Sequence, residues 1–429
     1  MFSRLIPPGA SYALAGFILL ASPAVAATAA DLPDGDAPLT LDKALVLALG
    51  GSPTLAAAHQ EALASAAAIR PAGRLPNPEL AISLENVAGS GAYRDSDAAE
   101  WTIELSQPLE LGGKRRLRRE AAELERLTAV SGEALVRADV LAATRQRYIA
   151  VLAAQDGLIL TKEQAELAER SLLAADERIR EGKAPTIDRL RLQGEASLAR
   201  LAVAAAERSL ATARSALAAC WGEARLSFGR VAGDLAELPP LPEAAAIESA
   251  LAQSPAATNR RLEAELAGNQ LAQARAARIP DPSLTVGWRQ FEESDEQAWL
   301  FGLSIPLPLF SHGQDELLAA SHRLNGAQAR GHDALLAAQL ALQAAWQELA
   351  DTRAEAELLA ETVVPAAAEG HAAAEFGYRA GKFGLIELLD AQRTLFDAYQ
   401  RRHAARVACH LAAAELGRLL GVAMTTPTP

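Results

Sequence analysis

The sequence predicts an α+β membrane protein that is exported and that joins short strands to very long helices. Three observations support this prediction: an N-terminal segment with a cleavage site, an internal duplication, and two stretches of more than 60 residues with almost no proline. Of the 429 residues, 50% are hydrophobic and only 4% are aromatic, and Ala, Leu, Glu and Arg are abundant. Such a composition is typical of long packed helices.

Net charge and cysteine content exclude several classes of function. The formal net charge of −12 argues against a broad nucleic-acid-binding surface. The two cysteines, Cys220 and Cys409, are too few for a disulfide scaffold or a zinc cluster built on thiolates. The sequence has no Gly-rich phosphate loop, no nucleophile elbow and no His-Glu-x-x-His pair, so we expect neither an enzyme nor a bound cofactor.

Residues 1–26 are interpreted as a secretory signal peptide. Arg4 supplies the positive charge, residues 12–21 form a short apolar core, and Ala24-Val25-Ala26 fits a small-residue cleavage site. Ten apolar residues are too few to span a bilayer. The remaining chain has no apolar run long enough for a spanning helix, so we expect it to enter a membrane only as a β-barrel.

An internal duplication organises the rest of the chain. The segment WTIELSQP at 101–108 recurs as WLFGLSIP at 299–306, and Glu-Gly-Lys at 181–183 recurs as Ala-Gly-Lys at 380–382. We expect a first repeat over residues 39–222, a second over residues 243–421, and a disordered C-terminal tail over residues 422–429. Each repeat is predicted to run helix, strand, loop, strand, long helix, turn, helix.

Four segments alternate apolar and polar residues with the period of two that is typical of strands. These segments are residues 80–85, 101–106, 284–288 and 299–305. Polar loops are expected between them, at 86–100 and 290–298. Four strands cannot close a barrel, because membrane barrels need about eight or more. Since open strand edges in lipid leave backbone groups unpaired, copies of the chain must pool their strands, and spacing alone leaves eight and twelve strands both open.

The longest predicted helices cover residues 114–180, without proline, and residues 314–379, with Pro365 only. At about 1.5 Å per residue each is on the order of 100 Å long. Leucines and alanines recur at three-, four- and seven-residue steps, which is the pattern of coiled-coil packing. Gly182 and Gly381 are expected to end these helices as left-handed caps.

The shorter predicted helices cover residues 53–74, 186–220 and 385–420. A helix of about 22 residues stacked end to end on one of about 35 nearly matches a helix of 67 residues. We therefore expect each long helix to pair with two shorter ones and to form a wall of uniform thickness.

Several motifs resemble the TolC-type outer-membrane factors, the outer membrane efflux protein family. They are Leu-Pro-Asn-Pro-Glu-Leu at 75–80, Gln-Pro-Leu-Glu-Leu-Gly-Gly-Lys-Arg at 107–115, Ile-Pro-Leu-Pro-Leu-Phe at 305–310 and Tyr-Arg-Ala-Gly-Lys at 378–382. The run ending in Gly-Gly-Lys-Arg is similar to the branch that serves cobalt–zinc–cadmium and copper–silver efflux.

The resemblance implies a homotrimer in the outer membrane of a Gram-negative bacterium. Its twelve-stranded β-barrel, with four strands per chain, would lie in the outer-membrane lipid and continue as a long α-helical coiled-coil tunnel in the periplasm. Its partners would be a periplasmic adaptor protein and an inner-membrane transporter of the resistance-nodulation-division class. The implied function is a passive exit channel for heavy-metal cations, gated at the periplasmic tip.

Two sets of candidate site residues follow from the repeat and the resemblance. The helix turns that contain Gly182, Lys183, Gly381 and Lys382 are expected at one end of the tunnel, as tips that dock the adaptor. Glu387 and Asp390 project from one face of the second returning helix. The resemblance implies that they line the periplasmic gate, where threefold symmetry would gather six carboxylates.

We expect no metal-binding site. His312, His322 and His332 are ten residues apart, about 280° around a helix, and so face different directions. His403 and His410 share a face but lie about 10 Å apart, too far for one ion. Two alternatives stay open: the outer-membrane factor of a multidrug efflux or type I protein secretion system, and a periplasmic coiled-coil scaffold without a channel.

Overall fold

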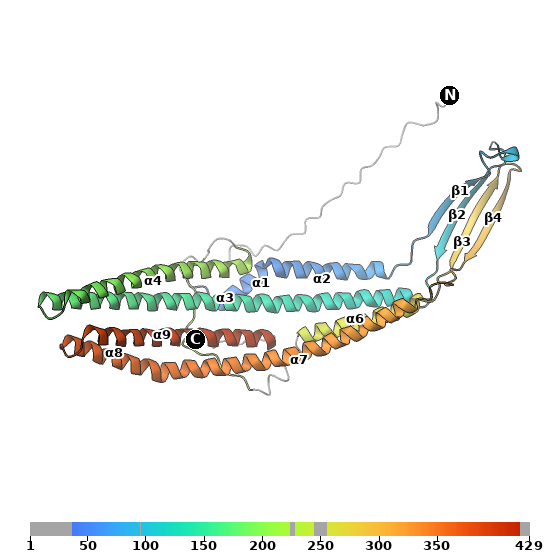
Figure 1. Ribbon diagram of the computed structural model, residues 1–429. Helices are drawn as coiled ribbons and strands as arrows, with labels where there is room; N and C mark the ends of the chain where they lie inside the picture. The colour runs from blue at the N-terminus through green and yellow to red at the C-terminus, as the bar shows by residue number, and fades with distance from the viewer. Residues whose placement is uncertain (1–36, 95, 224–227, 244–254, 421–429) are drawn as a thin grey trace, which may run out of the picture.

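The computed structural model describes residues 37–94, 96–223, 228–243 and 255–420. The expected signal peptide and C-terminal tail lie outside these ranges. The protein is an elongated helical body with a four-stranded sheet at one end (Figure 1). Its first half contains α1 (Leu41–Gly51), α2 (Pro53–Ala72), β1 (Glu79–Glu85), β2 (Glu100–Pro108), α3 (Lys114–Arg180) and α4 (Thr186–Ala218). Its second half contains α6 (Pro255–Ala277), β3 (Ser283–Phe291), β4 (Glu296–Ser304), α7 (Gln314–Leu358), α8 (Val364–Arg379) and α9 (Leu385–Leu420).

The helix α3 extends over 67 residues, as predicted, and is about 100 Å long. It packs against α2 near the sheet and against α4 toward the opposite end (Figure 1). The helix α2 begins where predicted because the Ser52 hydroxyl accepts a hydrogen bond from the Leu55 N–H (3.4 Å) and Pro53 follows at the first helical position. The expected pairing of one long helix with two shorter ones is therefore confirmed in this half.

The long helix of the second half is interrupted. A π-helical turn, Leu359–Val363, separates α7 from α8, and Pro365 stands in the first turn of α8. Proline has no N–H to donate and its ring clashes with the preceding turn, so an insertion just before it relieves the helix. The uninterrupted helix expected over 314–379 is thus corrected to two helices joined by one widened turn.

The strands form one antiparallel sheet in the order β1-β2-β3-β4, so the central pair β2–β3 joins the two halves of the chain. Paired residues point to the same face. A row of apolar side chains crosses all four strands, because Ile82 pairs with Ile103, Ile103 with Trp288, and Trp288 with Trp299. One face of the sheet is apolar and exposed, while the other carries the glutamates and threonines of the same strands.

The four predicted strands are confirmed, but the loop expected over 290–298 is wrong. The strands continue to Phe291 and from Glu296, so that Gln290 pairs with Gln297. From the sequence, these polar residues predict a loop. In the structure their backbone groups continue the pairing of β3 with β4.

A buried hydrophobic core surrounds α1, between α3, the end of α4 and residues 228–235. This 11-residue helix was not predicted from the sequence. The Tyr148 hydroxyl on α3 lies within hydrogen-bond distance of the carbonyl oxygens of Leu39 (2.8 Å) and Ala232 (2.5 Å). Leu39 and Val231 also form a parallel bridge, so the segments before α1 and after α4 are held against α3. Among the described residues, no helix combines the length and the apolar character needed to cross a membrane.

Candidate functional site

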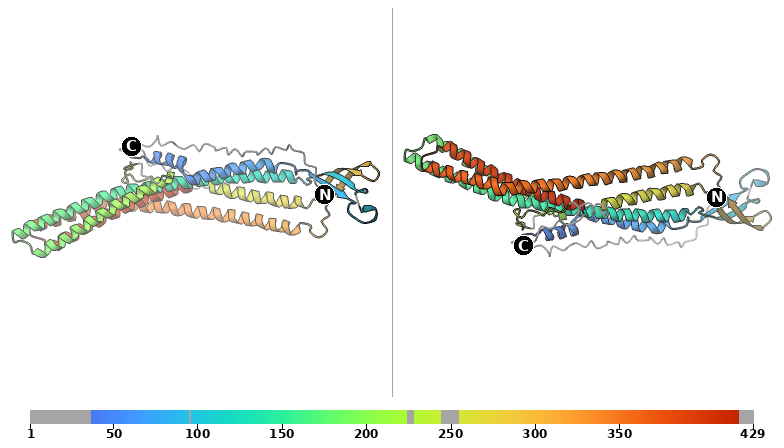
Figure 2. Two further views of the ribbon diagram at one scale, coloured as in Figure 1. Left: turned by 90° about the horizontal axis from the view of Figure 1, so that it is seen from above. Right: turned by 90° about the horizontal axis from the view of Figure 1, so that it is seen from below.

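The two helix turns that carry Gly182 and Gly381 lie together at the end of the helical body opposite the sheet (Figures 1 and 2). Both glycines have left-handed φ angles, +71° and +72°. In the first turn the Lys183 N–H donates to the Arg178 carbonyl (2.8 Å), and in the second the Lys382 N–H donates to the Gly377 carbonyl (2.8 Å). These six-residue bonds define the Schellman ending of a helix and confirm the predicted caps.

The tips are open to solvent. Gly182, Lys183, Gly381 and Lys382 are all exposed, and a Cβ added at either glycine would meet no atom within 4 Å. The Lys183 ammonium lies 2.9 Å from the Glu181 carboxylate and lowers the pKa of that carboxyl through their hydrogen bond. The tips thus combine a capped backbone with exposed charged side chains, and nothing in the described part of the chain covers them.

A cation–π contact ties the two tips together. The Arg178 guanidinium at the end of α3 lies 4.4 Å from the ring centroid of Tyr378 and donates to the Tyr378 carbonyl. Tyr378 packs in a small buried cluster with Leu192 of α4 and with Leu385 and Leu388 of α9. This link was not predicted from the sequence, although Arg178 and Tyr378 stand 200 residues apart in the last turns of α3 and α8.

Glu387 and Asp390 lie in the first two turns of α9, and both are exposed. Leu385 and Leu388 face the buried cluster and thereby turn these carboxylates away from it. Neither carboxylate forms an ion pair with a described residue. The repeat-related positions are Asp188 and Arg191 on α4, so the two tips differ in charge.

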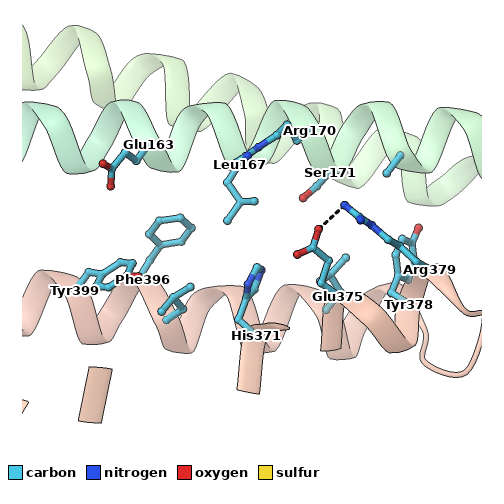
Figure 3. Close-up of a pocket in the computed structure, with 13 residues that line it drawn as sticks. Glu163, Leu167, Arg170, Ser171, His371, Glu375, Tyr378, Arg379, Phe396 and Tyr399 are labelled. Carbon is cyan, nitrogen blue, oxygen red and sulfur yellow. Dashed lines mark hydrogen bonds and ion pairs between the residues drawn. The ribbon is translucent and has the colours of Figure 1, made fainter. Parts of the chain in front are cut away.

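A pocket of about 370 Å³ lies next to the tips, on the side toward the sheet. It is enclosed by α3 on one side and by α8 and α9 on the other (Figure 3). His371 lines it and is 9% exposed, while Glu375 forms an ion pair of 2.6 Å with Arg379. His371 was not predicted from the sequence to be a site residue. His371 lies seven residues before Tyr378, and residues seven apart share a helix face in a coiled coil. This spacing was the available signal that both side chains face inward.

The described residues contain no group of three or more His, Cys, Asp or Glu side chains placed to hold a metal ion. His312, His322 and His332 are exposed at separate points along the second half. His403 and His410 are enclosed between helices, and burial lowers the pKa of both imidazoles. The candidate site therefore consists of two exposed helix turns and two exposed carboxylates at the end of the helical body opposite the sheet.

Comparison with known proteins agrees with this architecture. The Outer membrane efflux protein family matches residues 44–223 and 246–422. The cobalt-zinc-cadmium resistance protein CzcC of Cupriavidus metallidurans is 35% identical over 388 residues, 90% of each chain. The nickel-cobalt-cadmium resistance protein NccC of Alcaligenes xylosoxydans is 28% identical over 64% of this chain and 62% of its own.

A solved structure shares the fold. The outer membrane channel CmeC of Campylobacter jejuni superposes with a TM-score of 0.75 at 17% identity, covering 89% of this chain and 85% of that one. The arrangement of a four-stranded sheet on long paired helices is therefore that of the TolC-type channels. The chain belongs to the outer membrane efflux protein family, whose members are conduits in the outer membrane and are not enzymes.

Proposed function

We propose that the protein is the exit channel of a tripartite efflux pump and that it exports heavy-metal cations. The pump would contain a periplasmic adaptor and an inner-membrane transporter of the resistance-nodulation-division class. Two relatives with cobalt, zinc, nickel or cadmium resistance in their names support the cargo, one of them over 90% of the chain. The channel is a passive conduit, because its cargo is chosen by the transporter that delivers it.

The sheet is the observation that carries the channel proposal. It has one exposed apolar face and two open edges, β1 and β4, whose backbone groups have no partner strand within the described chain. Unpaired backbone groups are too costly to leave in lipid. Three copies that pair β1 of one with β4 of the next would close a barrel of twelve strands, and the helices below would then form the periplasmic tunnel.

In this proposal the chain contains two copies of one unit, residues 39–222 and 243–421. Each copy contains one helix turn that forms a tip. A trimer presents six tips, and the exposed Gly182, Lys183, Gly381 and Lys382 form the surface that meets the adaptor. Glu387 and Asp390 line the entrance as a ring of six carboxylates, which attracts and concentrates cations.

Metal resistance and channel conductance together test the proposal. Expression in a host that lacks its own heavy-metal outer-membrane factor, together with the cognate adaptor and transporter, should restore growth on cobalt, zinc or cadmium. The purified protein should also give discrete conductance steps in planar bilayers. Conductance without metal resistance would favour a drug or protein secretion channel, and the absence of conductance would favour a scaffold.

A further inference from the structure

The junction between the sheet and the helices is strongly basic, although the chain as a whole is acidic. We define the junction as residues 70–78, 109–119, 275–282 and 305–319, which connect the strands to the helices. It contains nine basic and four acidic residues, in a chain whose net charge is −12. The junction is therefore locally positive within a chain that is negative as a whole.

Much of this positive charge has no partner within the described chain. Lys114 pairs with Asp281 (2.7 Å), and Arg118 pairs with Glu110 (2.5 Å). Arg116 forms an ion pair with Glu120, one helical turn further along α3. Six further arginines are exposed and form no ion pair with a described residue: Arg70, Arg74, Arg115, Arg119, Arg275 and Arg278.

The junction also exposes apolar side chains at the same level. Between β4 and α7, Leu307 is 72% exposed, Leu309 is 68% exposed and Phe310 is fully exposed. The Arg278 guanidinium lies beside this loop, since its Nε donates to the His312 carbonyl (3.1 Å). A fully exposed phenylalanine and an arginine without an ion pair at the same level of the molecule are typical of a surface that meets both acyl chains and headgroups.

The arrangement is present twice in the chain. Arg74-Leu75-Pro76 before β1 corresponds to Arg278-Ile279-Pro280 before β3. Leu75 is 58% exposed and Ile279 is 43% exposed. Because both copies stand at the helix-side end of a strand, a closed assembly repeats the pair of an exposed arginine and an exposed aliphatic residue around its circumference.

Strand length sets the depth of the junction in the membrane. A strand of nine residues, such as β3 or β4, is about 30 Å long. Tilted by about 35–45°, it rises about 21–25 Å, which is close to the height of about 25 Å of the apolar band of an outer-membrane barrel. The helix-side ends of the strands therefore lie at the level of the headgroups on the periplasmic side. The apolar row on the sheet continues into the loop that carries Phe310 without a polar break, through Leu303, Ile305 and Leu307.

We infer that this junction is a binding collar for anionic phospholipids of the periplasmic leaflet. Phe310 and the exposed leucines enter the acyl region, while Arg74, Arg278 and the neighbouring unpaired arginines hold the headgroup phosphates. The inference rests on the proposed insertion of the sheet in the outer membrane. It goes beyond that proposal because it names a lipid class and a site that selects for it.

Lipid retention by the purified protein tests the charge part. Wild-type protein in detergent, loaded with phosphatidylglycerol or phosphatidylcholine, is examined by native mass spectrometry. Retention of phosphatidylglycerol should exceed that of phosphatidylcholine. Each basic residue near an anionic surface changes binding about fivefold, so Arg74→Gln with Arg278→Gln should reduce retention about tenfold or more. The matched control, Arg208→Gln with Arg401→Gln on the exposed surface of α4 and α9, should not change it.

A fluorescence experiment tests the apolar part independently. Phe310→Trp should add emission that is quenched by brominated phospholipid in vesicles, whereas the emission added by Phe376→Trp, at a site on α8 that is 71% exposed, should not be quenched. Equal retention of both lipids, equal losses in the control variant, or an unquenched Phe310→Trp would overturn the inference. Conductance is recorded on the same preparations: a protein that conducts but shows no lipid preference refutes only the collar, and a protein that does not conduct refutes the channel.

Discussion

The two tips differ in charge, although their residues occupy matching positions in the two halves of the chain. Glu387 and Asp390 are both acidic and exposed, whereas the matching positions of the first half are Asp188 and Arg191. Glu387, in the first turn of α9, also interacts favourably with the helix dipole, which is worth about 0.3–1 kcal/mol. That effect stabilises α9 whether or not the same carboxylates meet their symmetry mates, so channel recordings are needed to detect the gate.

Glu387→Gln with Asp390→Asn should weaken both cation selectivity and block by multivalent cations. The double substitution removes six charges from a trimer, and charges a few ångströms apart interact by about 1 kcal/mol even in water. We therefore expect the blocking concentration of a trivalent cation to rise about tenfold in single-channel recordings. Asp188→Asn on the first tip is the control, and unchanged block in the double variant would locate the constriction elsewhere.

Gly381→Leu should abolish metal resistance without reducing the yield of trimer. The added side chain enters open space, so it obstructs a partner but no atom of its own chain. Any residue with a Cβ is strained by about 1–2 kcal/mol at a left-handed φ. Gly381→Ala is the matched control, because it carries the same strain with little bulk. Loss of resistance in both variants, or loss of trimer, would indicate that Gly381 acts only as a helix cap.

Residues with a backbone requirement could be predicted from the sequence, and residues defined by a distant partner could not. Gly182 and Gly381 follow from a local rule about how helices end. The contact between Arg178 and Tyr378 depends on how two hairpins are rotated against each other, which no local pattern records. The same limit applies to His371, whose burial depends on α3 lying across it.

Helices with a long repeating pattern of apolar residues were predicted more accurately than short helices and single insertions. The helix α3 matches its predicted bounds because 67 residues contain many turns of the same apolar spacing. The short helix α1 was missed because its three turns are held by tertiary contacts, with Ala44 and Ala48 fully buried against other segments. The π-helical turn before Pro365 was missed because a single inserted residue leaves no periodic signal.

The packing of α9 against the segment after α4 should weaken in mild acid. His410 is 7% exposed, with its Nε2 3.4 Å from the Leu235 carbonyl, and burial lowers the pKa of its imidazole in the folded protein. The unfolded chain then binds more protons, so stability falls as the pH is lowered through about 6.5, the ordinary value.

Thermal unfolding at pH 7.5 and pH 5.5 measures this effect. His410→Gln keeps a polar group near the Leu235 carbonyl but cannot titrate, so its Tm should drop less between the two pH values than that of the wild type. The exposed His322→Gln provides the comparison and should retain the wild-type drop. An identical drop in both variants would show that His410 does not contribute.

The whole molecule is incomplete as a single chain, because the sheet has two open edges. Cysteines introduced as Ile82→Cys on β1 and Phe301→Cys on β4 should therefore be joined between copies by a bismaleimide in detergent. The expected product is a ladder that ends at the trimer on a denaturing gel. Either substitution alone should give at most dimers, and the native Cys220 and Cys409 are buried. A ladder ending at the dimer would refute the twelve-stranded barrel.

The pairing of β2 with β3 joins the two halves within one continuous sheet, and this has an evolutionary consequence. A ring of six separate half-length chains would have to carry any mutation at all six positions at once. Because one chain contains both halves, the halves can differ, and in the proposed trimer Arg191 occupies three positions while Asp390 occupies the other three. A substitution in one half thus alters every second hairpin of the ring and leaves the other hairpins unchanged.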